Sequence, residues 1–393
     1  MRIFFLTFAS TLFLSAQLLP AQLRFKTEEL ATRIEAGQSV RTADINQDGK
    51  VDICVVDSKR ILWLENPTWK EHVILSSKVE LKDVCIEPRD FDRNGKMDLA
   101  VGVEWRSDIP NPRAVVGKLE NTGEEPWKFH PARKQTADHS IHWVDLDHNG
   151  RPWLVVSEIK DSTEASLEER KIRLLAIQPS APGKLWTTRV LWDSLQLLYR
   201  FDPKDFLEGN KMPLATRAYM PAEILTKNQR EALLQLANSR VPILPKRGAG
   251  QVRPGHLHDG SPFLAVAQTE ADNRLVIYYP TAWQQSVQPW ISTKIDSKNA
   301  RAQVLACGNL DQDKEHEIIV GVRETEKDTR SVDGLRVYDQ KTPKREWLRI
   351  QLDSNGGTLA DLTIADLDQD GDNEIIALGK SPANLKIYWN ERP

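Results

Sequence analysis

Cysteine is scarce in this chain, and its scarcity excludes one way of holding a fold together. Only three cysteines occur in 393 residues: Cys54, Cys85 and Cys307. A small odd number cannot form a disulfide framework, although a single bridge remains open. All three lie in apolar, strand-like runs, which favours buried free thiols.

Long blocks of charge of one sign are also lacking. The 53 lysines and arginines nearly balance the 56 acidic residues, and the net charge is −3. Both signs are spread along the chain. Proteins that bind nucleic acid concentrate basic residues on one face, so we expect no nucleic-acid partner.

Beyond the N-terminus, long apolar runs are missing as well. The one such run, Ile3 to Leu19, follows a single arginine and precedes Ala21. This order is typical of a signal peptide, which we predict over residues 1–21. An uncleaved membrane anchor is the alternative. We therefore expect a secreted or periplasmic monomer with no membrane span after cleavage.

What the chain does contain is a repeat built on an acidic loop. Four copies share one pattern: TADINQDGKVDICVV from Thr42, PRDFDRNGKMDLAVG from Pro88, CGNLDQDKEHEIIVG from Cys307 and IADLDQDGDNEIIAL from Ile364. Oxygen-bearing side chains occupy positions one, three and five of a nine-residue loop. An acid closes the loop at position nine, and a β-branched run follows.

Three weaker copies complete the series. The copy at Trp143 has a tryptophan at position nine, and the two others are eroded further. The seven loops start at Asp44, Asp90, Asp145, Asp205, His256, Asn309 and Asp366. A repeat of roughly fifty residues thus fills residues 22–393.

Each copy contains four short strand-like segments, which is the content of one propeller blade. A tryptophan marks the start of the fourth segment in five copies: Trp69, Trp127, Trp186, Trp290 and Trp347. We therefore predict an all-β, seven-bladed β-propeller. A linear solenoid is the alternative, and it would need polar capping repeats at both ends.

The two ends of the repeat array complement one another. Phe25 stands where a tryptophan is expected before Asp44, whereas the C-terminal copy stops one strand short. We predict that the segment 25–30 forms the outermost strand of the last blade, which closes the ring and removes exposed sheet edges.

One segment departs from the repeat. Within about 220–246, Thr226 and Gln229 form a capping-box pair ahead of apolar residues at helical spacing, Leu233, Leu236 and Ala237. We predict a small helical insertion in the fourth blade. It packs on the flank of the propeller or, alternatively, acts as a lid.

The acidic loops predict calcium as the bound ion. Calcium takes six to eight oxygen ligands, and alternate residues of a tight loop deliver them. The candidate ligands are Asp44, Asn46, Asp48, Asp52, Asp90, Asp92, Asn94, Asp98, Asp145, Asp147, Asn149, Asn309, Asp311, Asp313, Glu317, Asp366, Asp368, Asp370 and Glu374. An ordinary Asp/Asn/Gly turn is the alternative for each loop. The pair His256 and His258 lacks the third ligand of a transition-metal site.

These loops and their flanking strands resemble the FG-GAP/VCBS repeat family of secreted and cell-surface propellers. The segments ENPTWKEHVI and KIYWNE are similar to a bacterial subgroup related to the propeller part of aldos-2-ulose dehydratase. In that subgroup histidines cluster where the innermost strands begin. His139 and Asp361 match such positions, whereas Gln303 stands where a histidine is expected.

Two functions follow from this pattern. The first is a binding or scaffold module whose top face holds a glycan, a sugar or a protein. The second is a carbohydrate-active lyase or dehydratase acting on keto-sugars. There His139 would abstract a proton next to a carbonyl, Arg247 or Arg301 would stabilise the enolate oxygen, and Asp361 would complete the site.

Overall fold

In the residues that the computed structural model describes, every regular element is a β-strand. The described residues are 23–78, 80–90, 94–104, 115–134, 141–144, 152–159, 171–178, 186–196, 251–268, 274–280, 290–296, 302–322, 334–340, 346–354 and 356–391. Within them no helix is long and apolar enough to span a membrane.

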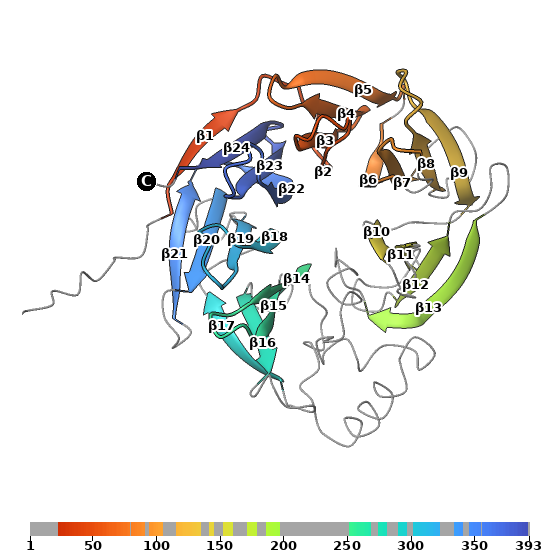
Figure 1. Cartoon of the computed structure of the whole chain (residues 1–393). Helices are drawn as coiled ribbons and strands as arrows, with labels where there is room; N and C mark the ends of the chain where they lie inside the picture. The colour runs from red at the N-terminus through yellow and green to blue at the C-terminus, as the bar shows by residue number, and fades with distance from the viewer. Residues whose placement is uncertain are drawn as a thin grey trace, which may run out of the picture.

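The strands form six four-stranded antiparallel sheets arranged around a central axis like the blades of a propeller (Figure 1). Five sheets use strands consecutive in the chain, and the innermost strand comes first. They are β2(Ser39–Ala43) β3(Asp52–Val56) β4(Arg60–Glu65) β5(Lys70–Ser76); β6(Lys82–Arg89) β7(Asp98–Glu104) β8(Val115–Glu120) β9(Lys128–Lys134); β10(Ile141–Val144) β11(Trp153–Ile159) β12(Lys171–Gln178) β13(Thr187–Gln196); β14(Gln251–His256) β15(Pro262–Gln268) β16(Arg274–Pro280) β17(Trp290–Asp296); and β18(Ala302–Gly308) β19(Glu317–Val322) β20(Gly334–Gln340) β21(Trp347–Asp353).

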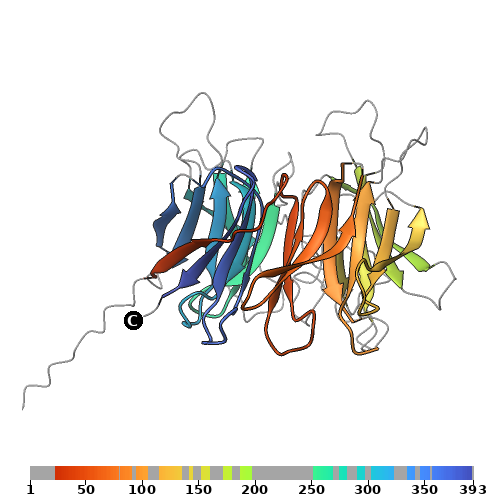
Figure 2. The same cartoon turned by 90° about the horizontal axis from the view of Figure 1, so that it is seen from above.

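The sixth sheet joins the two ends of the chain. Its order is β1(Phe25–Glu29), β24(Leu385–Asn390), β23(Glu374–Ser381) and β22(Thr358–Ala365). The ladder between β1 and β24 runs from Phe25 opposite Asn390 to Glu29 opposite Lys386. Figure 2 shows β1, in red, alongside the blue C-terminal strands. The prediction that the segment 25–30 forms the outermost strand of the last sheet is confirmed over Phe25–Glu29.

Burial follows the position of each strand in its sheet. All five residues of β3 are buried, whereas β1 at a sheet edge is mostly exposed. Middle strands pack on both faces because neighbouring sheets stack against one another around the ring. Their sequences are accordingly continuous apolar runs such as ICVV and EIIVGV.

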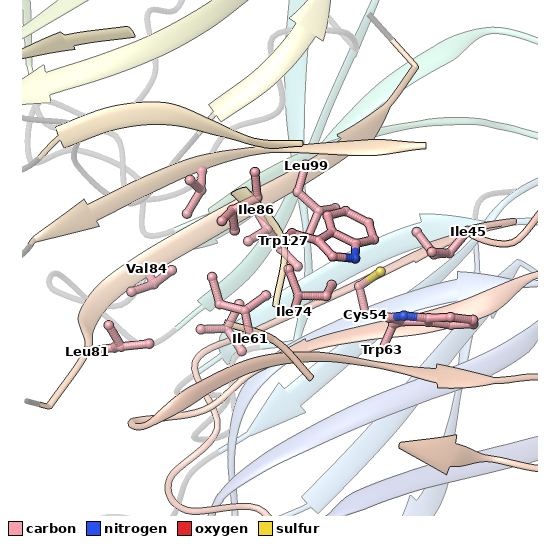
Figure 3. Close-up of a cluster of buried hydrophobic side chains, with 13 residues drawn as sticks. Ile45, Cys54, Ile61, Trp63, Ile74, Leu81, Val84, Ile86, Leu99 and Trp127 are labelled. Atoms are coloured by element: carbon pink, nitrogen blue, oxygen red, sulfur yellow. The ribbon is translucent and has the colours of Figure 1, made fainter. Parts of the chain in front are cut away.

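The apolar core lies between the sheets. In the cluster drawn in Figure 3, Cys54 and Ile61 of the sheet β2–β5 pack with Ile86 and Leu99 of the next sheet. Trp127, just before β9, extends the same cluster and is 5% exposed. Burying one such side chain contributes about 1.5–3 kcal/mol, so each interface between sheets stabilises both neighbours.

All three cysteines are free thiols, Cys54 and Cys85 being buried. Several other predictions fall outside the described residues. These are the signal peptide over 1–21, the blade with the loop from Asp205, and the helical insertion at 220–246. Six sheets are described, so the blade count of seven stays a prediction.

Candidate metal centres and the inner-strand cluster

The loop 366–374, between β22 and β23, gathers three carboxylates. Asp366, Asp368 and Glu374 each offer an oxygen, and these oxygens lie within 4.8 Å of one another. The backbone turns through left-handed residues, Gln369 at φ 64° and Gly371 at φ 92°. The tight loop thereby brings together acids that repel one another.

Glu374 is the buried member of this group, at 1% exposure. One oxygen, Oε2, accepts a 2.7 Å hydrogen bond from the Leu367 amide. The other, Oε1, is buried without a hydrogen-bond partner, as is Oδ1 of Asp366. Burial, reinforced by Asp368 and Asp370, raises the pKa of Glu374 to about 7. Ionised, these oxygens need a cation beside them.

The loop 309–317, between β18 and β19, repeats this arrangement. Asp311, Asp313 and Glu317 place carboxylate oxygens within 4.8 Å of one another. Glu317 is fully buried, and its Oε1 has no hydrogen-bond partner. Its Oε2 accepts a 2.6 Å bond from the Leu310 amide. Burial, followed by the charge of Asp311, raises the pKa of Glu317 to about 9.

The loop 44–52, between β2 and β3, is built differently. Both oxygens of Asp52 are satisfied by main-chain amides, those of Ile45 and Asn66, each at 2.9 Å. The Asp44 carboxylate accepts from the amides of Asp48 and Gly49 at 3.1 and 2.9 Å. These bonds are those of a well-formed acidic turn, which an ion must compete with.

In the loop 90–98 the Asp90 carboxylate accepts from the amides of Asn94 and Gly95. Oδ1 of the closing acid, Asp98, accepts from the Asn121 amide at 2.8 Å. Asp92 lies outside the described residues, as do Asp145, Asp147 and Asn149 of the third loop.

Of the four predicted catalytic residues, only Asp361 lies in the described part of the chain; His139, Arg247 and Arg301 do not. Asp361 is on the innermost strand β22, and its side chain is 5% exposed. Its Oδ2 accepts from Ser39 Oγ and the Val40 amide, both at 3.2 Å, and from Arg41 Nη1 at 2.9 Å. The carboxylate is therefore bound to the neighbouring strand β2.

Asp361 belongs to a cluster that spans four innermost strands. Arg41 of β2 also contacts Glu87 of β6, with Nε 3.5 Å from Oε2. Nδ1 of His142, on β10, lies 3.5 Å from the same Glu87 oxygen. The side chains of Glu87 and His142 are 5% and 7% exposed. A buried polar chain thus crosses three boundaries between sheets close to the axis.

Sequence reasoning missed Arg41 and Glu87 in this cluster. The repeat contained the signal, since Arg41, Glu87 and His142 each stand three positions before the first residue of an acidic loop. Equivalent positions of adjacent inner strands come close together in a propeller.

Comparison with known proteins supports the repeat. A family model described as an FG-GAP-like repeat matches residues 44–101, which contain the first two acidic loops. No curated protein matches the chain.

Solved structures with a similar fold cover nearly the whole chain at low similarity. They include BBS1N in complex with ARL6DN (11% identity, TM-score 0.45, 95% of this chain and 98% of that one). Others are the PQQ-bound aldose sugar dehydrogenase of Streptomyces coelicolor (8%, 0.46, 95% and 99%) and the α-L-arabinofuranosidase Arb93A of Fusarium graminearum (12%, 0.44, 94% and 97%). Likenesses of this strength carry no argument about what this chain binds or does.

Proposed function

We propose that this chain is a secreted or periplasmic, calcium-stabilised β-propeller that acts as a binding or scaffold module for a glycan or protein ligand. One observation carries the proposal. In two loops a buried glutamate, Glu317 or Glu374, has an oxygen without a hydrogen-bond partner among the described residues and belongs to a group of three carboxylates. Without a cation such a group opposes folding.

The donor set favours calcium. All the gathered ligand atoms are carboxylate oxygens, which hard cations prefer, and neither group includes a histidine or cysteine. The ion would be held by Asp366, Asp368 and Glu374 in one loop and by Asp311, Asp313 and Glu317 in the other. It would supply positive charge where each inner strand turns into the next, and so fix the loop.

The inner-strand cluster supports a rigid scaffold. One carboxylate oxygen of Asp361 accepts hydrogen bonds from three donors on β2, and Arg41 of the same strand contacts Glu87 of β6. Such pairing holds the inner strands in register, and the ring then presents its loops from a fixed frame.

The metal part is tested by measuring bound calcium in the chelator-stripped, refilled full-length protein. We expect Glu374→Gln and Glu317→Gln each to lose one bound ion. Glu391→Gln, at an exposed position after β24, is the matched control and should lose none. A wild-type protein that binds no calcium, or the same amount of magnesium, would contradict the proposal.

The ligand part is tested by screening the same protein on glycan arrays and against envelope proteins. Secretion is tested by the N-terminus of the exported protein, which we expect just after residue 21. Absence of any ligand on both screens, or a retained leader, would contradict the corresponding part of the proposal.

A second candidate is the carbohydrate-active lyase or dehydratase. One observation favours it: the carboxylate of Glu87 and the imidazole of His142 lie together with the guanidinium of Arg41 near the axis. We would assay keto-sugar turnover in the wild type and in the His139→Ala and His142→Ala variants. Turnover that survives both substitutions would exclude a histidine base.

A further inference from the structure

Three of the acidic loops are linked by hydrogen bonds from one loop to the next. They are the loops 309–317, 366–374 and 44–52, which belong to three consecutive sheets and include the junction where β1 closes the ring. Two kinds of amide side chain make the links, a glutamine at loop position four and an asparagine at the end of the third strand.

The glutamines reach forward to the next loop. Gln312 donates its side-chain amide to the main-chain oxygen of Gly371 at 3.2 Å and to Asp372 Oδ1 at 2.6 Å. Gln369 donates in the same way to the main-chain oxygen of Gly49. Both glutamines have positive φ, 59° and 64°. Each loop is thus attached to the glycine of its successor.

Asn66 makes a second link, between the loops 44–52 and 366–374. Its main-chain amide donates to Asp52 Oδ1 at 2.9 Å, and its side-chain amide donates to the main-chain oxygen of Leu367 at 2.7 Å. The Leu367 amide in turn donates to Glu374 Oε2 at 2.7 Å. The closing acids of two loops are therefore connected through two residues.

Asn390 repeats this link one sheet earlier. Its side-chain amide donates to the main-chain oxygen of Leu310 and, at 3.4 Å, to that of Asn373 in the loop 366–374. The Leu310 amide donates to Glu317 Oε2 at 2.6 Å. A path of hydrogen bonds through side-chain amides thus connects the three loops.

From this path we propose that the three loops bind calcium cooperatively, with Gln312, Gln369, Asn66 and Asn390 as the coupling residues. The inference rests on the calcium binding proposed above. An ion that fixes Glu374 also fixes the Leu367 amide bonded to it. The main-chain oxygen of Leu367, which accepts from Asn66, is then held in place for the loop 44–52. The next ion then enters a loop that is already ordered, and binds more tightly.

Coupling matters most for the loop 44–52. Both oxygens of Asp52 already accept hydrogen bonds from main-chain amides, so this loop attracts an ion less strongly than the other two. We expect this loop to fill after the loop 366–374, to which Gln369 and Asn66 connect it.

The test compares three glutamines with the same backbone conformation. Gln47 also stands at loop position four with φ 61°, but among the described residues its side chain has no bond to another loop. Gln47→Ala is therefore a matched control for the pair Gln312→Ala with Gln369→Ala. Each full-length protein is stripped of metal and titrated with calcium by calorimetry, and its melting temperature in chelator verifies folding.

We expect the wild type and Gln47→Ala to give the same titration, with a Hill coefficient above one. In the double variant we expect the coefficient to fall to about one and the midpoint to rise by about fivefold or more. Glu374→Gln should also weaken calcium binding at the loop 309–317 by a similar factor, although the ligands of that loop are unchanged.

The outcomes separate the two proposals. A wild type that binds no calcium overturns the proposed function and the coupling with it. Calcium bound with a Hill coefficient of one overturns the coupling and leaves calcium binding intact. A coefficient above one that the double variant retains, or that Gln47→Ala loses equally, overturns the role of the glutamine links.

Discussion

The side-chain amide of Asn66 donates a 2.7 Å hydrogen bond to the main-chain oxygen of Leu367, which is 301 positions away. The same amide group also donates to the Val51 oxygen at 3.0 Å. One buried residue therefore serves two main-chain acceptors in adjacent sheets, at the junction where the ring closes.

Asn66→Ala should destabilise the protein by about 1–3 kcal/mol, because two main-chain oxygens lose their donor. Asn121→Ala is the control, since it stands at the equivalent position and its side chain accepts from the Gly123 amide within its own turn. Urea unfolding in chelator measures both. Equal losses of stability would show that the link between sheets contributes nothing.

Closure of the ring should depend on apolar residues that flank β1. Leu30, 5% exposed, packs among residues of β23 and β24. Leu30→Ala should lower the free energy of unfolding by about 2–5 kcal/mol through lost burial and a cavity. Leu348→Ala, on the outer strand β21 at 47% exposure, should change it little. Comparable effects of the two substitutions would contradict the role of β1 in the core.

Arg41 should stabilise the inner-strand cluster, because it neutralises two buried carboxylates. Arg41→Met removes the guanidinium that contacts both Asp361 and Glu87, at a cost of about 1–3 kcal/mol. Asp361→Asn in the Arg41→Met background should recover part of the loss. A double-mutant cycle by thermal unfolding gives the coupling, and strictly additive effects would refute it.

Removing calcium should lower thermal stability. An ion present at about one hundred times its dissociation constant stabilises the folded state by about 2.7 kcal/mol. Calorimetry in calcium and in chelator should therefore give clearly separated melting temperatures. In Glu317→Gln the difference should shrink. Identical melting curves in the wild type would show that the ions, if bound, do not act on folding.

Cys54 and Cys85 should be inert in the folded protein, in contrast to Cys307, which is only partly buried. Burial raises the pKa of the Cys54 thiol, and Cys85 is 4% exposed, so neither forms an accessible thiolate. We expect slow reaction of Cys54 and Cys85 with a thiol reagent until the protein unfolds, and no change of melting temperature with reductant. A mass two daltons low together with a reductant-sensitive melting temperature would reveal a disulfide instead.

Repeat spacing predicted the strands, the order of the sheets and the pairing of β1 with β24, since these depend on periodicity and on the position of Phe25. The acidic loops were likewise visible in the sequence. Their differences were not, because whether a closing acid keeps a free oxygen depends on which amides the fold brings to it. Asp52 receives two such amides. Glu374 Oε1 receives none from the described residues.

The inner-strand cluster was predicted only in part for a related reason. The family resemblance indicates Asp361, whereas nothing in the local sequence distinguishes Arg41 from the other basic residues. Its importance comes from contacts with Asp361 and Glu87 on two other sheets, and no local pattern encodes such contacts.

The join between β1 and β24 also bears on the order of folding. Residues such as Glu29 and Asn384, bonded to each other, are 355 positions apart. Contacts of that separation carry a large loop-closure entropy, which favours their formation after the local hairpins have assembled. Until then the last sheet exposes an unpaired edge on β24, so an arrested or truncated chain offers a template for aggregation.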